Sequence, residues 1–237
     1  MGRFPNIAAS KAKTGAAKAK VYSSYAKEIY TCAKQGGTDP NGNLALRHLI
    51  DKAKKEQVPQ DVIKRAIDKV NSGVDETYTF VRYEGFASGG ATIMVDCLTD
   101  NVNRTVSMVK NAFTKSKGKM GVEGCVSHMY EHLSVVVVKD MKEDEALEAL
   151  LSNDVDAKEI SEEDGNVSIY GEPDSLYKIK DAILSVKPEA DFIVDEVTYL
   201  SSDMVTLSGE DKENFEKMIN MLDDIEDVQK VYHNVNL

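Results

Sequence analysis

The sequence predicts an α+β protein of several domains, with an N-terminal three-helix bundle followed by two α/β sandwich-like domains, one of them ferredoxin-like and inserted into the other. Three observations predict this fold. Apolar residues recur at helical spacing as far as residue 70, the spacing becomes that of strands after Thr77, and a strand–helix–strand–strand–helix–strand order follows residue 127. The chain has 237 residues, of which 42% are hydrophobic, enough for two or three compact cores.

The N-terminal region predicts three short helices. The first ends at the glycines of residues 36–37, and its apolar stripe consists of Tyr22, Tyr25, Ile29 and Cys32. The second follows a turn and buries a stripe within residues 46–53, and the third has Pro59 in its first turn and continues to Val70. Residues 1–20 contain lysines and small residues but almost nothing to bury, so we expect a flexible arm there.

The region after Thr77 is rich in β-forming residues. We expect a hairpin of residues 78–83 and 91–98, then a helix over residues 103–115. The next segment predicts a βαββαβ unit, the split βαβ or ferredoxin-like arrangement. Its elements are, in chain order, a strand at 127–139, a helix at 143–151, strands at 157–161 and 166–170, a helix at 175–186 and a strand at 192–199.

The C-terminal segment predicts a strand, a helix and a strand, at residues 205–207, 210–222 and 228–235. Three elements alone make a marginal domain, so we expect them to return and complete the sheet that residues 78–126 begin. The expected domains are therefore residues 1–75, residues 76–126 together with 203–237, and the inserted residues 127–202.

The charge of the chain is divided along its length. Residues 1–70 contain 14 Lys and Arg against 6 Asp and Glu, a net charge of +8, whereas the remainder contains 15 against 34, a net charge of −19. A basic module beside an acidic body is typical of proteins that contact phosphates with one domain. The alternative is that the lysines only solvate the helices.

The composition excludes several other classes. No apolar run approaches the roughly 20 residues that span a bilayer, and no apolar stretch follows a charged segment at the N-terminus, so neither a membrane protein nor an exported one is expected. Three widely spaced cysteines, Cys32, Cys97 and Cys125, encode neither a disulfide framework nor a zinc site. We therefore expect a protein of the reducing cytoplasm.

No catalytic constellation is evident, so we expect no enzyme activity, no metal and no cofactor. Ser88-Gly89-Gly90 lacks the spacing of a phosphate loop and fits a hairpin turn. His128 and His132 are roughly 13 Å apart if their segment is a strand, too far to share a metal. Glu84, Asp96 and Asp100 have no histidine cluster nearby, and Asp100-Asn101 fits a helix cap.

The basic region supplies most of the residues that we expect to bind nucleic acid. Lysines neutralise phosphates without reading bases, so the expected result is affinity rather than specificity. Tyr30 lies off the apolar stripe and could stack on a base, whereas Tyr22 and Tyr25 fit the core. For Arg104 we expect either a salt bridge at a domain interface or a contact with a phosphate. The complete set is Lys11, Lys13, Lys18, Lys20, Lys27, Tyr30, Lys34, Lys54, Lys64, Arg65 and Arg104.

The chain resembles the YebC/PmpR family over nearly its whole length. The residues that carry the resemblance are Tyr83–Phe86, Leu98–Thr105, Met120–Val126 and Glu226–Asn234, and in the helical part Gly36–Pro40, Asn43, Ile50, Ala53-Lys54, Pro59, Ile63 and Arg65–Ile67. The resemblance implies an all-helical N-terminal domain followed by two α/β domains. The opening, Gly2–Ile7, departs from the usual small polar, basic and tryptophan residues, and Cys125 replaces a serine. This opening resembles the branch found in low-GC Gram-positive bacteria.

The resemblance implies two roles: DNA-binding transcriptional regulators and ribosome-associated translation factors, including a mitochondrial translational activator. We expect a DNA-binding regulator, although no helix has the Arg, Asn and Gln pattern of a base-reading face. The alternative is a translation factor that binds ribosomal or transfer RNA and the ribosome. A third possibility is a protein-interaction module that uses acidic helices at residues 143–148 and 210–216. A monomer or a weak dimer fits each.

Overall fold

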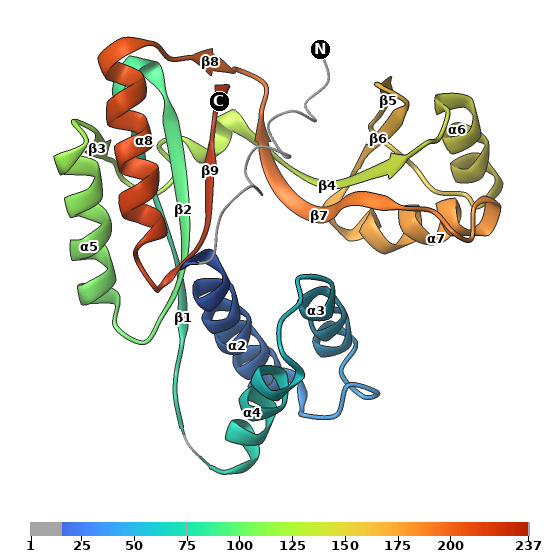
Figure 1. Ribbon diagram of the computed structural model, residues 1–237, viewed down its shortest axis with the longest axis horizontal. Coiled ribbons are helices and arrows are strands. Elements are labelled where there is room, and N and C mark those ends of the chain that lie inside the picture. The colour runs from blue at the N-terminus through green and yellow to red at the C-terminus, as the bar shows by residue number, and fades with distance from the viewer. Residues whose placement is uncertain (1–15, 74, 237) are drawn as a thin grey trace. The chain divides into compact units, whose positions relative to one another are not determined.

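The computed structural model describes residues 16–73 and 75–236 (Figure 1). Within them, one compact unit comprises residues up to 127 together with 207–233, and the other comprises 128–206 together with 234–236. The α+β class predicted from the sequence is confirmed: a helical region precedes two antiparallel sheets that carry helices. The three expected domains, with boundaries at residues 75, 126 and 202, stay a prediction.

Three helices form the N-terminal region: α2 (Ala16–Gly36), α3 (Leu44–Lys55) and α4 (Gln60–Asn71). Their shared core includes Ile29, Leu46 and Ile63, each at most 4% exposed. Because α2 begins at Ala16, part of the expected flexible arm is helical, and the rest lies outside the described residues. For residues 16–20 the expectation was wrong, because alanine and lysine favour a helix and Lys20 contacts the end of α8.

Asn43 joins the end of α2 to the start of α3. Its side-chain oxygen accepts a hydrogen bond from the N–H of Leu46, 3.1 Å away, and so caps α3. Its amide nitrogen donates to the carbonyls of Cys32 and Gly37, at 3.2 and 2.9 Å. One buried side chain therefore provides hydrogen-bond partners for backbone groups at the end of α2 and at the start of α3.

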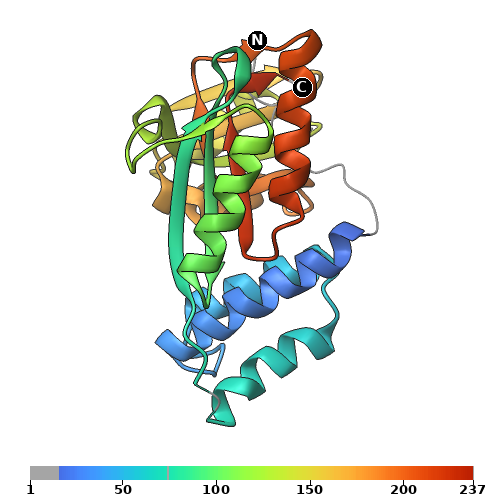
Figure 2. The ribbon, with the colours of Figure 1, turned by 90° about the vertical axis from the view of Figure 1, so that its left-hand side faces the viewer.

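The first unit also holds a four-stranded antiparallel sheet of order β3-β1-β2-β9. Two helices, α5 and α8, lie side by side along it (Figures 1 and 2). The elements are β1 (Thr79–Phe86), β2 (Thr92–Thr99), α5 (Val102–Lys115), β3 (Lys119–Met120), α8 (Gly209–Asp223) and β9 (Val228–His233). β9, near the end of the chain, returns to pair with β2, as the sequence predicts.

Two glycine sites shape this sheet. A Cβ atom on Gly85 would lie 2.5 Å from the carbonyl oxygen of Lys119, so only glycine lets β1 and β3 approach so closely. Between β1 and β2, the short 3₁₀ turn Ser88–Gly90 contains Gly89 and Gly90 at φ values of 69° and 79°. These glycines serve the hairpin turn, as predicted.

The second unit has the predicted βαββαβ order, and its strand order β5-β6-β4-β7 is antiparallel throughout. This is the ferredoxin-like arrangement, and its core forms between α6, α7 and the sheet. The elements are β4 (Tyr130–Lys139), α6 (Glu143–Ser152), β5 (Glu159–Glu163), β6 (Asn166–Gly171), the 3₁₀ turn Pro173–Ser175, α7 (Leu176–Val186) and β7 (Phe192–Ser201).

Three details differ from the expectation. β8 (Val205–Thr206) does not join the first sheet but pairs in parallel with β10 (Val235–Asn236). The predicted final strand is interrupted at Asn234, a buried residue whose amide donates to the carbonyl of Asp203, 2.9 Å away. Residues Ser127–Met129 form a 3₁₀ turn, so β4 begins three residues later than expected.

Replacement of Asn43 tests the junction between α2 and α3. Asn43→Ala removes the cap and both donated bonds, so the free energy of unfolding should fall by about 1–2 kcal/mol or more in urea titrations. Asn43→Asp keeps the capping oxygen but loses the amide donors, so it should fall between wild type and Asn43→Ala. Equal stability of all three proteins would contradict this account of the junction.

Candidate nucleic-acid interface

Two lysines of α2 contact the end of α8 and the turn that follows it. Lys20 Nζ donates to the carbonyl of Asp223, 2.6 Å away. Lys27 Nζ lies 3.0 Å from a carboxylate oxygen of Asp227 and 3.5 Å from one of Glu226, and the Lys27 side chain is only 11% exposed. These two cations bind the α/β part of the same unit, so they are not free surface charges.

Asp227 is a buried carboxylate that several elements share. It is 3% exposed and accepts hydrogen bonds from Lys27 of α2 and from Arg104 and Thr105 of α5, at 3.0, 2.7 and 2.8 Å. Burial alone would raise the pKa of Asp227, but the bonds from Arg104, Lys27 and Thr105 outweigh it and lower the pKa to about 2. The carboxylate is therefore ionised at neutral pH.

Arg104 is held by two carboxylates. Its guanidinium lies 2.6 Å from Asp100 and 2.7 Å from Asp227, and these hydrogen bonds raise its pKa. Since Asp227 also binds Lys27, the geometry favours the expected salt bridge over the expected phosphate contact. Asn101 caps α5 by accepting from the N–H of Arg104, as predicted, whereas Asp100 does not cap the helix and pairs with the Arg104 side chain instead.

The other carboxylates considered as possible catalytic groups have structural partners. Glu84 is buried and accepts hydrogen bonds from the N–H groups of Val126, Gly124 and Ser127. Burial raises the pKa of Glu84, but these backbone bonds reverse the effect and lower it overall. Asp96 forms a bidentate pair with Arg82 at 2.6 and 2.8 Å. Glu84 therefore holds the backbone of residues 124–127 in place, and Asp96 of β2 binds a side chain of the neighbouring strand β1.

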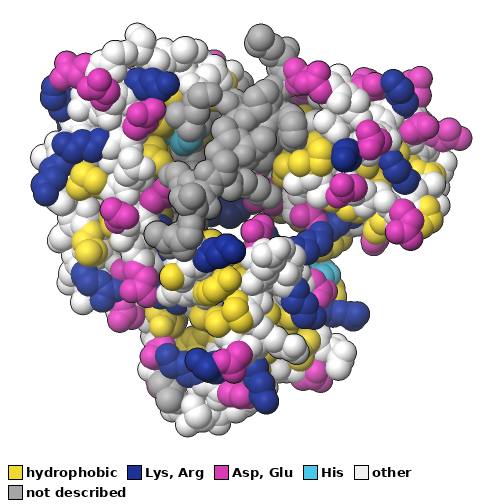
Figure 3. Space-filling view, in the orientation of Figure 1, with side chains coloured by type: hydrophobic (Ala, Val, Ile, Leu, Met, Phe, Trp, Pro, Cys, Tyr) yellow, Lys and Arg dark blue, Asp and Glu magenta, His cyan; other side chains and the backbone are white. Residues whose placement is uncertain are grey.

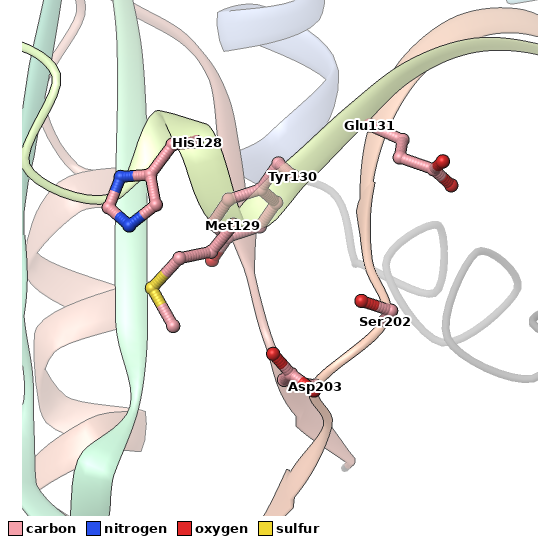
Figure 4. Close-up of a pocket in the computed structure, with 6 residues that line it drawn as sticks. All are labelled: His128, Met129, Tyr130, Glu131, Ser202 and Asp203. Carbon is pink, nitrogen blue, oxygen red and sulfur yellow. The ribbon is translucent and has the colours of Figure 1, made fainter.

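The two histidines that the sequence analysis considers as a metal pair lie in different elements. His128 lies in the 3₁₀ turn and His132 in β4, where the His132 ring stacks on Tyr199 with centroids 4.3 Å apart. A cavity of about 420 Å³ near this turn is lined by His128, Met129, Tyr130, Glu131, Ser202 and Asp203. Figure 4 shows the imidazole of His128 and the carboxylate of Glu131 directed apart. Among residues 16–73 and 75–236, no three metal-ligating side chains converge.

Tyr30 does not fit the role of a base-stacking residue. It is 3% exposed, and its hydroxyl accepts a hydrogen bond from the N–H of Glu76, 3.0 Å away. Tyr30 lies off the apolar stripe because it packs against the segment that leads to β1, not because it faces solvent. Tyr22 and Tyr25 pack against the helical core, as expected.

The remaining predicted cations are on the surface. Lys34 pairs with Asp75, Lys54 with Asp51 and Arg65 with Asp61. These are exposed pairs, which contribute little to stability and exchange easily with other anions. Lys18 and Lys64 are exposed as well, and Lys11 and Lys13 lie outside the described residues.

The outward face of α3 is basic. Leu46, Ile50 and Ala53 are buried, whereas Arg47, Lys54 and Lys55 are exposed at positions i, i+7 and i+8 of the same helix. We call these three residues the α3 basic face. Figure 3 shows several Lys and Arg side chains on the surface of the helical region, with hydrophobic and acidic side chains between them. The expected set omitted Arg47 and Lys55, although their spacing opposite the apolar stripe is a signal in the sequence.

Within the described residues, the structure contains no helix that is long and apolar enough to cross a membrane.

The fold, a helical region followed by two antiparallel sheets with helices, defines a class of α+β protein, and comparison with known proteins specifies the family. Residues 2–73 match the family described as "TACO1/YebC protein N-terminal domain", and residues 78–235 match "TACO1/YebC second and third domain". The chain belongs to this family.

Relatives of known sequence are similar to this chain along its whole length. The chain is 48% identical to a probable transcriptional regulatory protein of Vibrio cholerae, with all of both chains covered. It is 47% identical to one of Alteromonas mediterranea, over 99% of this chain and 98% of the relative. The crystal structure of a conserved hypothetical protein, Aq1575, from Aquifex aeolicus has a TM-score of 0.77 and 33% identity, and the match covers 95% of this chain and 93% of that one.

One expectation from the sequence is corrected by these relatives. Vibrio and Alteromonas are Gram-negative proteobacteria, so the expected placement in the low-GC Gram-positive branch was wrong. That placement depended on the opening at residues 2–7. An identity of 47–48% over the whole chain is a much stronger signal than six residues.

The low pKa of Asp227 predicts a stability that depends on pH. Because the folded pKa, about 2, lies below the ordinary value of 3.8, the stabilisation is complete above pH 3.8 and is lost as the pH falls through 2. The expected loss is about 2 kcal/mol. Urea unfolding from pH 5 to pH 2 measures it. Asp227→Asn should be less stable at pH 5, and its free energy of unfolding should change less between pH 5 and pH 2. A change as large as that of wild type would contradict the assignment.

Proposed function

We propose that this protein is a DNA-binding transcriptional regulator that has no enzymatic activity and contacts nucleic acid with its helical region. The observation that carries the proposal is the α3 basic face, because Arg47, Lys54 and Lys55 are exposed on a helix whose opposite side is buried. The relatives' description as probable transcriptional regulatory proteins supports the same conclusion. An acidic remainder of the chain keeps the other domains away from the same phosphates.

The predicted cations have different parts in this proposal. Lys54 is part of the α3 basic face, Lys18, Lys64 and Arg65 are exposed on α2 and α4 of the same helical region, and Lys11 and Lys13 are included on charge alone. Lys20, Lys27 and Arg104 have internal partners, so they position the helical region rather than contact phosphate. Lys34 also bridges Asp75 and the carbonyl of Glu76.

The α3 basic face favours contacts with phosphates over direct reading of bases. The exposed charged residues of α3 are Arg47, Asp51, Lys54 and Lys55, and α3 contains neither Asn nor Gln, which pair with adenine. The same observation supports a second candidate function, that of a translation factor that binds ribosomal or transfer RNA by shape and charge. Salt-sensitive affinity with weak sequence preference is expected in either case.

Substitution of the α3 basic face tests the proposed interface. For Arg47→Gln/Lys54→Gln/Lys55→Gln, we expect a lower affinity for duplex DNA and a log-affinity against log-salt slope that is reduced by about 2–3. The control is Lys110→Gln/Lys115→Gln/Lys178→Gln, which makes the same change in net charge at exposed positions elsewhere. Titrations at several salt concentrations give both quantities. Equal slopes for the two variants would show that the face makes no phosphate contact.

A further inference from the structure

A groove lies between α2, α4 and the segment that leads to β1. Its volume is about 340 Å³, at the small end of the range for ligand sites. Ala26, Val62 and Ala66 give it an apolar floor, and the other lining residues are charged, hydroxyl or aromatic: Ser23, Lys27, Tyr30, Arg65, Lys69, Glu76, Tyr78 and Glu226. We call it the α2–α4 groove.

We propose that the α2–α4 groove receives one unpaired nucleobase of a bound single strand, stacked on Tyr78, with the adjoining phosphate on Arg65. This inference rests on the proposed function, since it requires that the helical region binds nucleic acid. It adds a contact that the expected set of residues did not contain, because neither Tyr78 nor the groove was predicted from the sequence.

Tyr78 has the geometry of a stacking residue. Its side chain is partly exposed, whereas Tyr30, the other ring in the groove, is buried. The two rings meet edge to face with centroids 5.9 Å apart, and the Tyr78 hydroxyl donates to Glu76 at 2.7 Å. Both contacts hold the Tyr78 ring in place before a ligand arrives. A pre-positioned ring loses little conformational entropy when a base stacks on it.

One cation lies near the Tyr78 ring, and another, Arg65, is placed to bind a phosphate beside the base. Lys27 Nζ lies 5.9 Å from the centre of the Tyr78 ring. Arg65 projects from α4 with 76% of its side chain exposed, and its partner Asp61 lies four residues earlier on the same exposed surface. Such a pair is weak, so a phosphate can replace Asp61 at little cost. The other two cations of the lining are bound by buried or half-buried groups, Lys69 by Glu76 at 2.6 Å and Lys27 by Asp227 at 3.0 Å. Arg65 is therefore the lining cation that a phosphate can reach most easily.

The combination of features favours a nucleotide over other occupants. A purely apolar ligand would make no use of Arg65, whose pair with Asp61 is exposed and weak, and a simple anion would make no use of the ring and the apolar floor. A base with its phosphate can use both, because the base stacks on the ring and the phosphate binds Arg65. Because bases in a duplex are already stacked on each other, only an unpaired base can enter.

The test compares two single-stranded oligonucleotides of equal length and charge, one of mixed sequence and one in which every sugar is abasic. We expect wild type to bind the mixed strand more tightly. Tyr78→Leu should weaken binding of the mixed strand at least fivefold and leave the abasic strand unchanged. Tyr78→Phe keeps the ring and its edge-to-face contact with Tyr30 but loses the hydrogen bond to Glu76, so its loss of affinity for the mixed strand should be clearly smaller than that of Tyr78→Leu. Arg65→Gln should weaken both strands, and the exposed control Lys115→Gln should change neither.

Each other result has a distinct meaning. Equal affinity of wild type for the two strands, or equal losses for Tyr78→Leu on both, would overturn the groove as a base site and leave the proposed function intact. Binding of neither strand and of no duplex would instead overturn the proposed function. Urea unfolding of Tyr78→Leu and Tyr78→Phe shows whether both variants fold, and Arg65→Gln, an exposed substitution, tests the phosphate contact independently.

Discussion

The ionised carboxylate of Asp227 connects parts of the chain that are far apart in sequence. Lys27 of α2 and Arg104 of α5 both bind it, and its own backbone carbonyl accepts from the N–H of Leu98 in β2, 2.8 Å away. A buried charge of this kind is tolerated only when its partners are in place. The position of α2 on the first sheet, and therefore the faces that the helical region exposes, depend on this cluster.

The cluster also divides the cations of the basic region into two groups. Those on α2 that face the end of α8 are used inside the protein, as the contacts of Lys20 and Lys27 show. Those on the outward faces of α3 and α4 remain exposed, with Arg47 and Arg65 as examples. Net charge identifies the basic region, but the internal partners determine which part of it can meet a phosphate.

The sequence was sufficient to predict most of the fold, because local periodicity encodes it. The stripe at Ile29 and the strand at Val135–Val138 follow from the spacing of apolar residues, and the return of β9 follows from the need to complete a sheet. The site was less predictable, since it depends on contacts between distant residues. Asp227 meets Lys27 across 200 positions, and the burial of Tyr30 depends on the later segment that covers it. Neither contact can be predicted from the residues that are adjacent in the sequence.

In-cell crosslinking most directly tests whether the helical region binds DNA. The attached DNA and RNA would be sequenced for wild type and for a protein in which Lys11, Lys13, Lys18 and the α3 basic face are neutralised. The account predicts enrichment of discrete promoter DNA with wild type and its loss with the variant. Enrichment of ribosomal or transfer RNA would contradict the regulator and establish the translation factor, and equal enrichment in both proteins would remove the helical region as the interface.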